Sequence, residues 1–491
     1  MTVHQAIATN PDEDDENPFV EISESVQLLA RLSIVMAIAF AWWVGLNDRD
    51  SAPYPISRLL LFTLYTAIQT LPLWYRLPGV GLLHPLYVIA AYLFLKGTIP
   101  SLSQSAIGYR HIPGLPAMSA QGVAIMYMKV TGLYILAQIF TYFGFFTGRG
   151  IRWNFIEFRN RPNIVTYFVI ASLVIGLVAF WLLIDLSGGL YPHLKNITRG
   201  NAAKVWVKDA SNASIYATLC GLIVLPPAFL MLVGKNPGFN PVFWALTAIS
   251  IAVNYLTAGR RSAIVSAVII IVACWVLRTR TVSLARLSII WFLLFLSIGI
   301  FGEYRRSNWD GRRRVNFSAF QDNDIGEAME KTWSDLQQRR GGSPVPLIVY
   351  RVPKYVPFKY GMNYVGYINR FIPRRIWKNK PKGLATQCAE VFYGRYGSGA
   401  IPMGALGEAY WSGGIVAIPI VFFVWGRILC SIGTFYIRFR YSAIACMLYL
   451  LTVTRLEPSE LSFGRWVYVV VPTLIILFAF GELVRARHPD S

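Results

Sequence analysis

Charged residues are scarce in this chain. Aspartate, glutamate, lysine and arginine make up 14% of the 491 residues, whereas ordinary soluble domains contain about 25%. Hydrophobic residues make up 55%, and the mean hydropathy is +0.46. This composition excludes a soluble globular enzyme and a disordered protein, and it indicates a polytopic membrane protein with most of its chain in lipid.

Cysteine and histidine are also rare, with five residues of each. Four cysteines lie in or beside apolar runs and no Cys-x-x-Cys spacing occurs, which excludes a disulfide framework and a cysteine zinc site. No HExxH, Walker A or Rossmann motif is present. No histidine occurs between His193 and His488. His84 lies within a predicted span, where a packing role is favoured over a catalytic one.

Acidic residues are outnumbered, with 25 Asp+Glu against 46 Lys+Arg and a net charge of +21. On a membrane protein this excess indicates phosphate-bearing lipids or substrates. The many aromatic residues suit interfacial belts and sugar stacking equally. The first 26 residues reverse the charge, with seven acidic residues and no lysine or arginine. That is the opposite of the start of a signal peptide, so we predict a disordered cytoplasmic tail over residues 1–26.

Apolar stretches of the length that a spanning helix needs, about 20 residues, occur about twelve times. They lie near residues 27–46, 57–75, 79–97, 121–147, 163–186, 213–234, 241–258, 262–277, 287–302, 402–426, 441–454 and 466–484. The stretch 441–454 is short, and the stretch 402–426 begins among glycines.

Lysine and arginine in the short loops predict the orientation. With the N-terminus in the cytoplasm, arginines such as Arg149 and Arg278 fall in cytoplasmic connections, and most short outer loops are poorer in charge. We therefore predict an all-α transmembrane helical bundle with both ends in the cytoplasm. Nine spans lie within 27–302, three lie within 402–484, and a short cytoplasmic tail covers 485–491.

Residues 303–401 interrupt the apolar pattern and form one large outer loop in this topology. From Glu303 to Glu408 the chain has 18 Lys+Arg and 9 Asp+Glu. Loops of this length are usually functional or disordered, and this one is rich in tyrosine, tryptophan and proline rather than low in complexity. We predict an ordered cap of short helices over the outer face of the bundle.

Two adjacent arginines, Arg260 and Arg261, lie at the outer boundary where the span 262–277 begins. A helix N-terminus offers free N–H groups and a positive dipole end, and arginine adds a rigid fork of donors suited to phosphate. The pattern predicts a diphosphate site at the membrane surface. The alternative is that both side chains snorkel to lipid headgroups.

The segment 371–381 combines cations with one tryptophan between two prolines, which fix its backbone at both ends. Arg374, Lys380 and Trp377 are its candidate residues, because a sugar diphosphate needs charge for the phosphates and a flat ring for the sugar. Interfacial anchoring is the alternative function of this segment.

Glu408 lies among glycines and aromatics where the chain re-enters the membrane, next to Tyr410 and Trp411. Carboxylates at that depth are costly and usually functional, and removal from water makes a carboxylate a stronger base. Glu457 and Glu460, in the last outer loop, are further, weaker candidates to line the same cavity. The alternative is a structural salt bridge between Glu408 and an arginine of the large loop.

At these motifs the chain resembles the Wzy-type O-antigen (oligosaccharide repeat unit) polymerases. The matching patterns are Gly-x-Arg at residues 259–261, Pro-Arg-x-x-Trp-x-x-Lys-Pro at 373–381 and Gly-Glu-x-Tyr-Trp at 407–411. Twelve spans with one large outer loop before the last three also resemble that family. The family usually continues with Asn-aromatic-Gly, whereas Ser-Gly-Gly stands here at 412–414.

The resemblance implies a GT-C-like glycosyltransferase at the periplasmic face of the bacterial inner membrane. Such an enzyme transfers a growing glycan from undecaprenyl diphosphate to the non-reducing end of another lipid-linked repeat unit, without a metal or other cofactor. The implied partners are the undecaprenyl-diphosphate-linked oligosaccharide, membrane lipid and a chain-length co-polymerase, and no nucleic acid.

The reaction implies a role for each candidate residue. Glu408 is the predicted base for the attacking sugar hydroxyl, and Arg261 stabilises the charge of the departing diphosphate. The other predicted diphosphate contacts are Arg260, Arg374 and Lys380. The predicted sugar-orienting residues are Trp377, Tyr410 and Trp411.

Three other functions share parts of this pattern. An O-antigen ligase uses the same topology and lipid-linked substrate, but it is expected to carry a histidine in the large loop. A polysaccharide flippase or exporter needs charged residues within its spans, whereas the spans 163–186 and 262–277 are nearly purely apolar. A scaffold that only binds lipid diphosphates has no use for a membrane-embedded glutamate.

Overall fold

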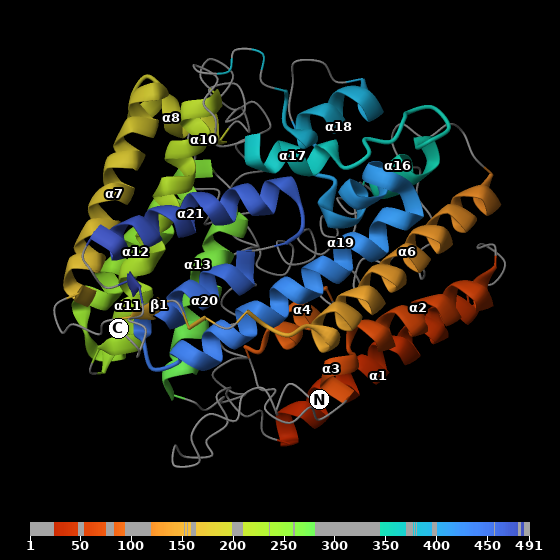
Figure 1. The fold of residues 1–491 in the computed structure, drawn as a ribbon, viewed down its shortest axis with the longest axis horizontal. Helices are drawn as coiled ribbons and strands as arrows, with labels where there is room; N and C mark the ends of the chain where they lie inside the picture. Colours follow the sequence, from red (N-terminus) through yellow and green to blue (C-terminus); the bar gives the residue numbers. More distant parts are fainter. Residues whose placement is uncertain are drawn as a thin grey trace, which may run out of the picture.

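The fold is a helical bundle (Figure 1), seen in a computed structural model. The structure describes residues 24–47, 54–74, 83–93, 119–151, 153–154, 156–158, 164–198, 210–234, 236–258, 261–279, 344–369, 377, 379, 381–394, 400–455, 457–479 and 483–485. Within these ranges the chain is helical almost throughout and has one two-stranded sheet. The predicted all-α class is confirmed, apart from that sheet.

Most helices of the first part of the chain fall on predicted apolar stretches, whereas Leu190–Thr198 and Pro237–Phe239 fall in predicted connections. They are α1 (Glu24–Asn47), α2 (Pro55–Gln69), α3 (Leu71–Trp74), α4 (Pro85–Leu93), α6 (Ala120–Thr147), α7 (Ile164–Leu186), α8 (Leu190–Thr198), α10 (Ala210–Leu219), η3 (Cys220–Val224), α11 (Leu225–Val233), η4 (Pro237–Phe239), α12 (Pro241–Ala258) and α13 (Arg261–Thr279). Proline in the first turn favours the starts of α2 and α11. The backbone N–H groups of a first turn have no partner within the helix, so proline loses no hydrogen bond there.

The second part of the chain contains three short helices followed by three long ones. They are α16 (Val345–Arg351), α17 (Met362–Asn369), α18 (Leu384–Tyr393), α19 (Gly404–Phe439), α20 (Ala443–Arg455) and α21 (Glu460–Ala479). The short helices α16, α17 and α18, here called the cap helices, occupy the described part of the predicted large loop. In Figure 1 they lie together at one end of α19 and α6.

Among the described residues, six helices are long and apolar enough to cross a membrane. They lie at Glu24–Trp43, Gln121–Thr147, Thr166–Leu186, Ile215–Val233, Gly404–Phe439 and Ser462–Ala479. Shorter apolar helices lie at Pro241–Thr257, Ile264–Thr279 and Ala443–Thr454, and the predicted span 287–302 falls outside the described residues. Large apolar side chains such as Met36, Trp181 and Phe478 are exposed, as expected where lipid is the solvent. The chain is thus a polytopic membrane protein, and the number of twelve spans stays a prediction.

The helix α19 corrects one predicted boundary. The apolar stretch was expected to end at residue 426, but the helix continues to Phe439. Arginine is a good helix former, so Arg427 and Arg438 extend the helix instead of ending it. The Arg427 guanidinium donates to the Thr147 carbonyl at 3.4 Å, and the Arg438 guanidinium donates to the Asn154 side-chain oxygen at 2.5 Å.

The two central helices, α6 and α19, pack closely over much of their length (Figure 1). Glycines at the crossing allow the two backbones to touch. A Cβ atom added at Gly144 would lie 2.1 Å from the Phe423 carbonyl oxygen, and one at Gly426 would lie 2.1 Å from the Thr141 carbonyl oxygen. Small residues are the usual device for close helix packing in membranes.

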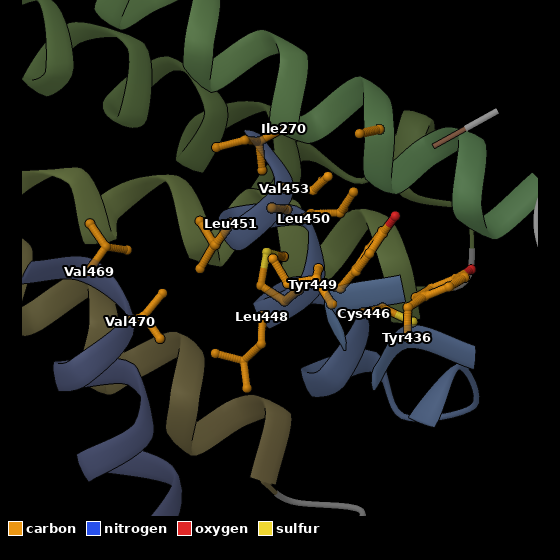
Figure 2. Packing of buried hydrophobic residues seen from close by; sticks show 14 of the residues in the cluster. Ile270, Tyr436, Cys446, Leu448, Tyr449, Leu450, Leu451, Val453, Val469 and Val470 are labelled. Carbon is orange, nitrogen blue, oxygen red and sulfur yellow. The ribbon is translucent and has the colours of Figure 1, made fainter. Parts of the chain in front are cut away.

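The largest apolar core surrounds α20, which lies between α11, α13, α19 and α21. Figure 2 shows its side chains, with Leu450 and Leu451 fully buried and the rings of Tyr436 and Tyr449 adjacent. The two ring centroids are 4.4 Å apart. Dense packing on all sides is expected to stabilise α20, which is the shortest predicted span.

A small sheet joins the α6–α7 connection to the end of the chain. Strand β1 (Ile156–Phe158) pairs antiparallel with β2 (Leu483–Arg485). The indole N–H of Trp153 also donates to the Ser431 carbonyl on α19 at 3.0 Å. These contacts place the α6–α7 connection, the C-terminal half of α19 and the chain end on one side of the bundle. The predicted topology puts the α6–α7 connection and the chain end on one side as well.

Candidate active site

The N-terminal part of α19 is a separate helical piece that carries three predicted site residues, Glu408, Tyr410 and Trp411. The break follows Ser412, because Gly413 and Gly414 have non-helical backbone angles. Gly414 has φ +64° and ψ −145°, a combination that is essentially restricted to glycine. The Ser-Gly-Gly sequence therefore ends the first piece, residues 404–412, and starts a new direction for residues 415–439.

The segment 357–363, a loop that runs into the first residues of α17, docks onto this break. The Lys359 backbone N–H donates to the Trp411 carbonyl at 2.9 Å, and the Gly361 N–H donates to the Ser412 hydroxyl at 3.0 Å. The Asn363 amide donates to the Glu408 carbonyl at 3.0 Å. Broken helices leave carbonyls unpaired, and here residues of the loop satisfy them. The break is therefore the place where the cap helices attach to the bundle.

Replacement of Gly414 by alanine tests whether this attachment requires glycine. We expect the G414A variant to lose about 1–3 kcal/mol of stability, because a Cβ is strained at this backbone conformation. The new Cβ would also lie 3.0 Å from the Phe358 ring. Thermal unfolding in detergent measures the loss. Gly366→Ala on α17 is the control, since nothing lies within 4 Å of its added Cβ, and equal melting temperatures for both variants would contradict the prediction.

The Glu408 carboxylate is buried where the bundle meets the cap helices, with 3% of the residue exposed. The Tyr367 hydroxyl of α17 donates to Oε2 at 2.6 Å, and the Glu460 backbone N–H donates to the same oxygen at 2.8 Å. Within the part of the chain that the structure describes, no donor reaches Oε1 and no arginine pairs with Glu408. The alternative of a salt bridge to a loop arginine is therefore not seen among those residues.

Helix N-termini stabilise the carboxylates of this site. Glu460 is the first residue of α21, so the N–H that reaches Glu408 lies at the positive end of that helix. The Glu460 carboxylate in turn accepts the Leu384 N–H at 2.6 Å, at the first residue of α18. The two glutamates thus connect α18, α19 and α21. Glu460 was expected near Glu408, and its backbone contacts that carboxylate directly.

Tyr367 is a site residue that the sequence motifs did not identify. Burial, and then the nearby Glu408 carboxylate, raise the pKa of its phenol above the ordinary value, so the hydroxyl stays a donor at physiological pH. Tyr367 and Asn363 are four residues apart on α17, which places both on one helix face. One face of α17 therefore contacts both the side chain and the carbonyl of Glu408.

Replacement of Tyr367 by phenylalanine removes the hydroxyl that orients the carboxylate. Hydrogen bonds to charged groups contribute about 1.5–3 kcal/mol, so we expect activity to fall by about tenfold or more with the protein still folded. The pH profile of activity should also change, which a packing defect alone would not cause. Tyr364→Phe is the matched control, because the buried Tyr364 hydroxyl has no partner among the described residues, and we expect no loss there.

The aromatic neighbours of Glu408 are packing residues in this structure. Tyr410 and Trp411 are 7% and 2% exposed, and the Trp411 ring meets the Phe392 ring edge-on with centroids 5.0 Å apart. The Trp411 indole N–H donates to the Pro357 carbonyl at 3.3 Å. Because both rings are covered, their positions favour a role in holding the cap helices over direct stacking on a sugar.

The remaining predicted residues are placed only in part. Arg261 begins α13, which confirms that it lies at a helix start. The half-buried Trp377 is described, whereas its neighbours in the 373–381 motif are mostly not. The side chain of Arg261 and all of Arg260, Arg374 and Lys380 lie outside the described residues. His84 packs edge-on against Phe145 with ring centroids 5.5 Å apart, in keeping with the predicted packing role.

Comparison with protein families, with curated proteins and with solved structures finds no match for this chain. Among the described residues, no group of three or more histidine, cysteine, aspartate or glutamate side chains is arranged to hold a metal ion.

Proposed function

We propose that this protein is a membrane glycosyltransferase that polymerises lipid-linked oligosaccharide repeat units. It would transfer a growing glycan from undecaprenyl diphosphate to the non-reducing sugar of another repeat unit, at the outer face of a bacterial inner membrane. The observation that carries the proposal is the buried Glu408 carboxylate, held through one oxygen at the junction of the bundle and the cap helices.

The arrangement of Glu408 suits a general base. In the proposed reaction, a sugar hydroxyl attacks the anomeric carbon of the donor glycan, and the bond from that carbon to the diphosphate oxygen breaks. The diphosphate leaves with the electron pair, and Glu408 accepts the hydroxyl proton. With Tyr367 and the α21 N-terminus both on Oε2, Oε1 is the oxygen left for that proton.

The base is covered in the present arrangement, because α17 contributes Tyr367 and Asn363 to its surroundings. With 3% of Glu408 exposed, a shift of α17 or of the loop that precedes it would open the carboxylate to a sugar hydroxyl. Exclusion of water from the site is useful before the acceptor sugar binds, because a carboxylate base that contacts water would promote hydrolysis of the glycosyl diphosphate. The proposed leaving-group contacts are Arg260, Arg261, Arg374 and Lys380.

Deletion of the gene, followed by gel analysis of surface and lipid-linked glycans, tests the proposal. A polymerase predicts that the ladder of chain lengths collapses to a single exported repeat unit. A full ladder retained on the lipid carrier would instead indicate a ligase. Repeat units that accumulate only on the cytoplasmic side would indicate a flippase. Either of these two results would overturn the proposal, and so would an unchanged ladder.

A further inference from the structure

Lys359, in the loop that precedes α17, is a cation without an acidic partner in the part of the chain that the structure describes. Its ammonium group lies over the Trp411 ring, 4.4 Å from the ring centroid, and donates to the Gln387 side chain of α18 at 2.5 Å. Among the described residues no carboxylate pairs with it. The carboxylate of α18, Glu390, pairs with Lys382 instead, at 2.5 Å. The side chain is half-buried, and burial lowers the pKa of its amine.

Within the described part of the chain, these contacts leave donors of the ammonium group available to a ligand. An ammonium group has three N–H donors, and Gln387 accepts only one of them. The face of an aromatic ring attracts a cation by about 0.5–2 kcal/mol, which does not replace a counter-ion for a partly desolvated charge. Gln387 is itself fixed, because its amide N–H₂ donates to the Lys382 carbonyl at 2.5 Å. The cation is thus held in place with donors to spare.

Lys359 contacts the same helical piece that carries the candidate base, Glu408. The backbone N–H and the ammonium group of Lys359 both contact Trp411, which is one helical turn from Glu408 on the same helical piece. The ammonium group thus lies beside the helical turn that follows Glu408, at the junction with the cap helices. A reaction that expels a diphosphate while a base accepts a proton needs both a cation and a carboxylate close to the reacting groups.

We propose that Lys359 is a phosphate-binding residue, and that its ligand is the diphosphate group of the lipid-linked substrate. This inference rests on the proposed function for the identity of the ligand. The phosphate of an anionic membrane lipid has the same chemistry, and the experiment distinguishes the two sources. The exposed Lys354, five residues earlier in the same segment, is the matched control.

Binding of farnesyl diphosphate to the purified full-length protein in neutral detergent tests the residue. We expect Lys359→Gln to weaken the affinity at least tenfold, Lys359→Arg to change it by less than about threefold, and Lys354→Gln to leave it unchanged. The affinity of the wild type should fall with added salt. Wild-type affinity in Lys359→Gln would overturn the inference, and an absence of binding to the wild type would overturn it as well.

Amine acetylation of the wild-type protein, read by mass spectrometry, makes the test independent of variant folding. Farnesyl diphosphate should protect Lys359 and leave Lys354 reactive, and no protection would refute the role. Protection by phosphatidylglycerol alone would confirm a phosphate subsite and assign it to membrane lipid. The glycan ladder of the deletion strain reports separately on the proposed function, so failure of the one is distinguishable from failure of the other.

Discussion

Replacement of Glu408 by glutamine is expected to abolish glycan polymerisation while the protein stays folded. A positioned general base contributes typically 10²–10⁴-fold to a rate, so the ladder of a strain that carries only this variant should collapse to single repeat units. The fold should persist because the glutamine oxygen can still accept from the Tyr367 hydroxyl and the Glu460 N–H, which now reach Oε2 at 2.6 and 2.8 Å.

The control for this variant is another carboxylate of the same region. Glu390→Gln removes an ion pair with the exposed Lys382, and such pairs contribute little to stability, so its ladder should match the wild type. Membrane levels and elution from a sizing column in detergent show that both variants are folded. A long ladder made by folded Glu408→Gln protein would show that the base lies elsewhere.

The helices of this fold were predictable because each depends on its own composition. A stretch of about 20 apolar residues in a membrane must satisfy its backbone internally, and a helix does so whatever its neighbours are. For this reason predicted ranges such as 121–147 and 163–186 match α6 and α7 closely. The predicted boundary at residue 426 was wrong because it was placed where hydropathy falls, at the first arginine. Arginine lowers hydropathy but favours helix formation, so the helix continues.

The candidate site was predictable in its glutamates and their aromatic neighbours, but not in the groups that hold the Glu408 carboxylate. A glutamate among apolar residues is conspicuous in a sequence, but its hydrogen-bond donors are 41 and 52 positions away, on Tyr367 and Glu460. Nothing local distinguishes Tyr367 from its buried neighbour Tyr364, whose hydroxyl has no partner among the described residues. Lys359 was equally inconspicuous in a basic loop, because its contacts with Trp411 and Gln387, and the absence of a counter-ion among the described residues, are properties of the tertiary structure.

Replacement of Gly144 by alanine is expected to have the largest effect on stability, although it adds a single methyl group. The new Cβ would lie 2.1 Å from the Phe423 carbonyl oxygen of α19, and the next nearest atoms also belong to that backbone. A side chain can change rotamer to relieve such a clash, whereas a helix backbone can only move as a whole. We therefore expect a loss of about 3 kcal/mol, at the upper end of the usual cost of overpacking.

A second glycine of the same helix is the control for this prediction. Gly132 also lies on α6, but nothing lies within 4 Å of a Cβ added there, and alanine is the better helix former by about 1 kcal/mol. Thermal unfolding in detergent should therefore show Gly132→Ala at or above the wild-type melting temperature and Gly144→Ala well below it. Because α19 carries Glu408, the Gly144→Ala variant should also lose polymer length at temperatures where it remains folded. Similar melting temperatures for the two variants would mean that α6 and α19 do not pack with their backbones in contact.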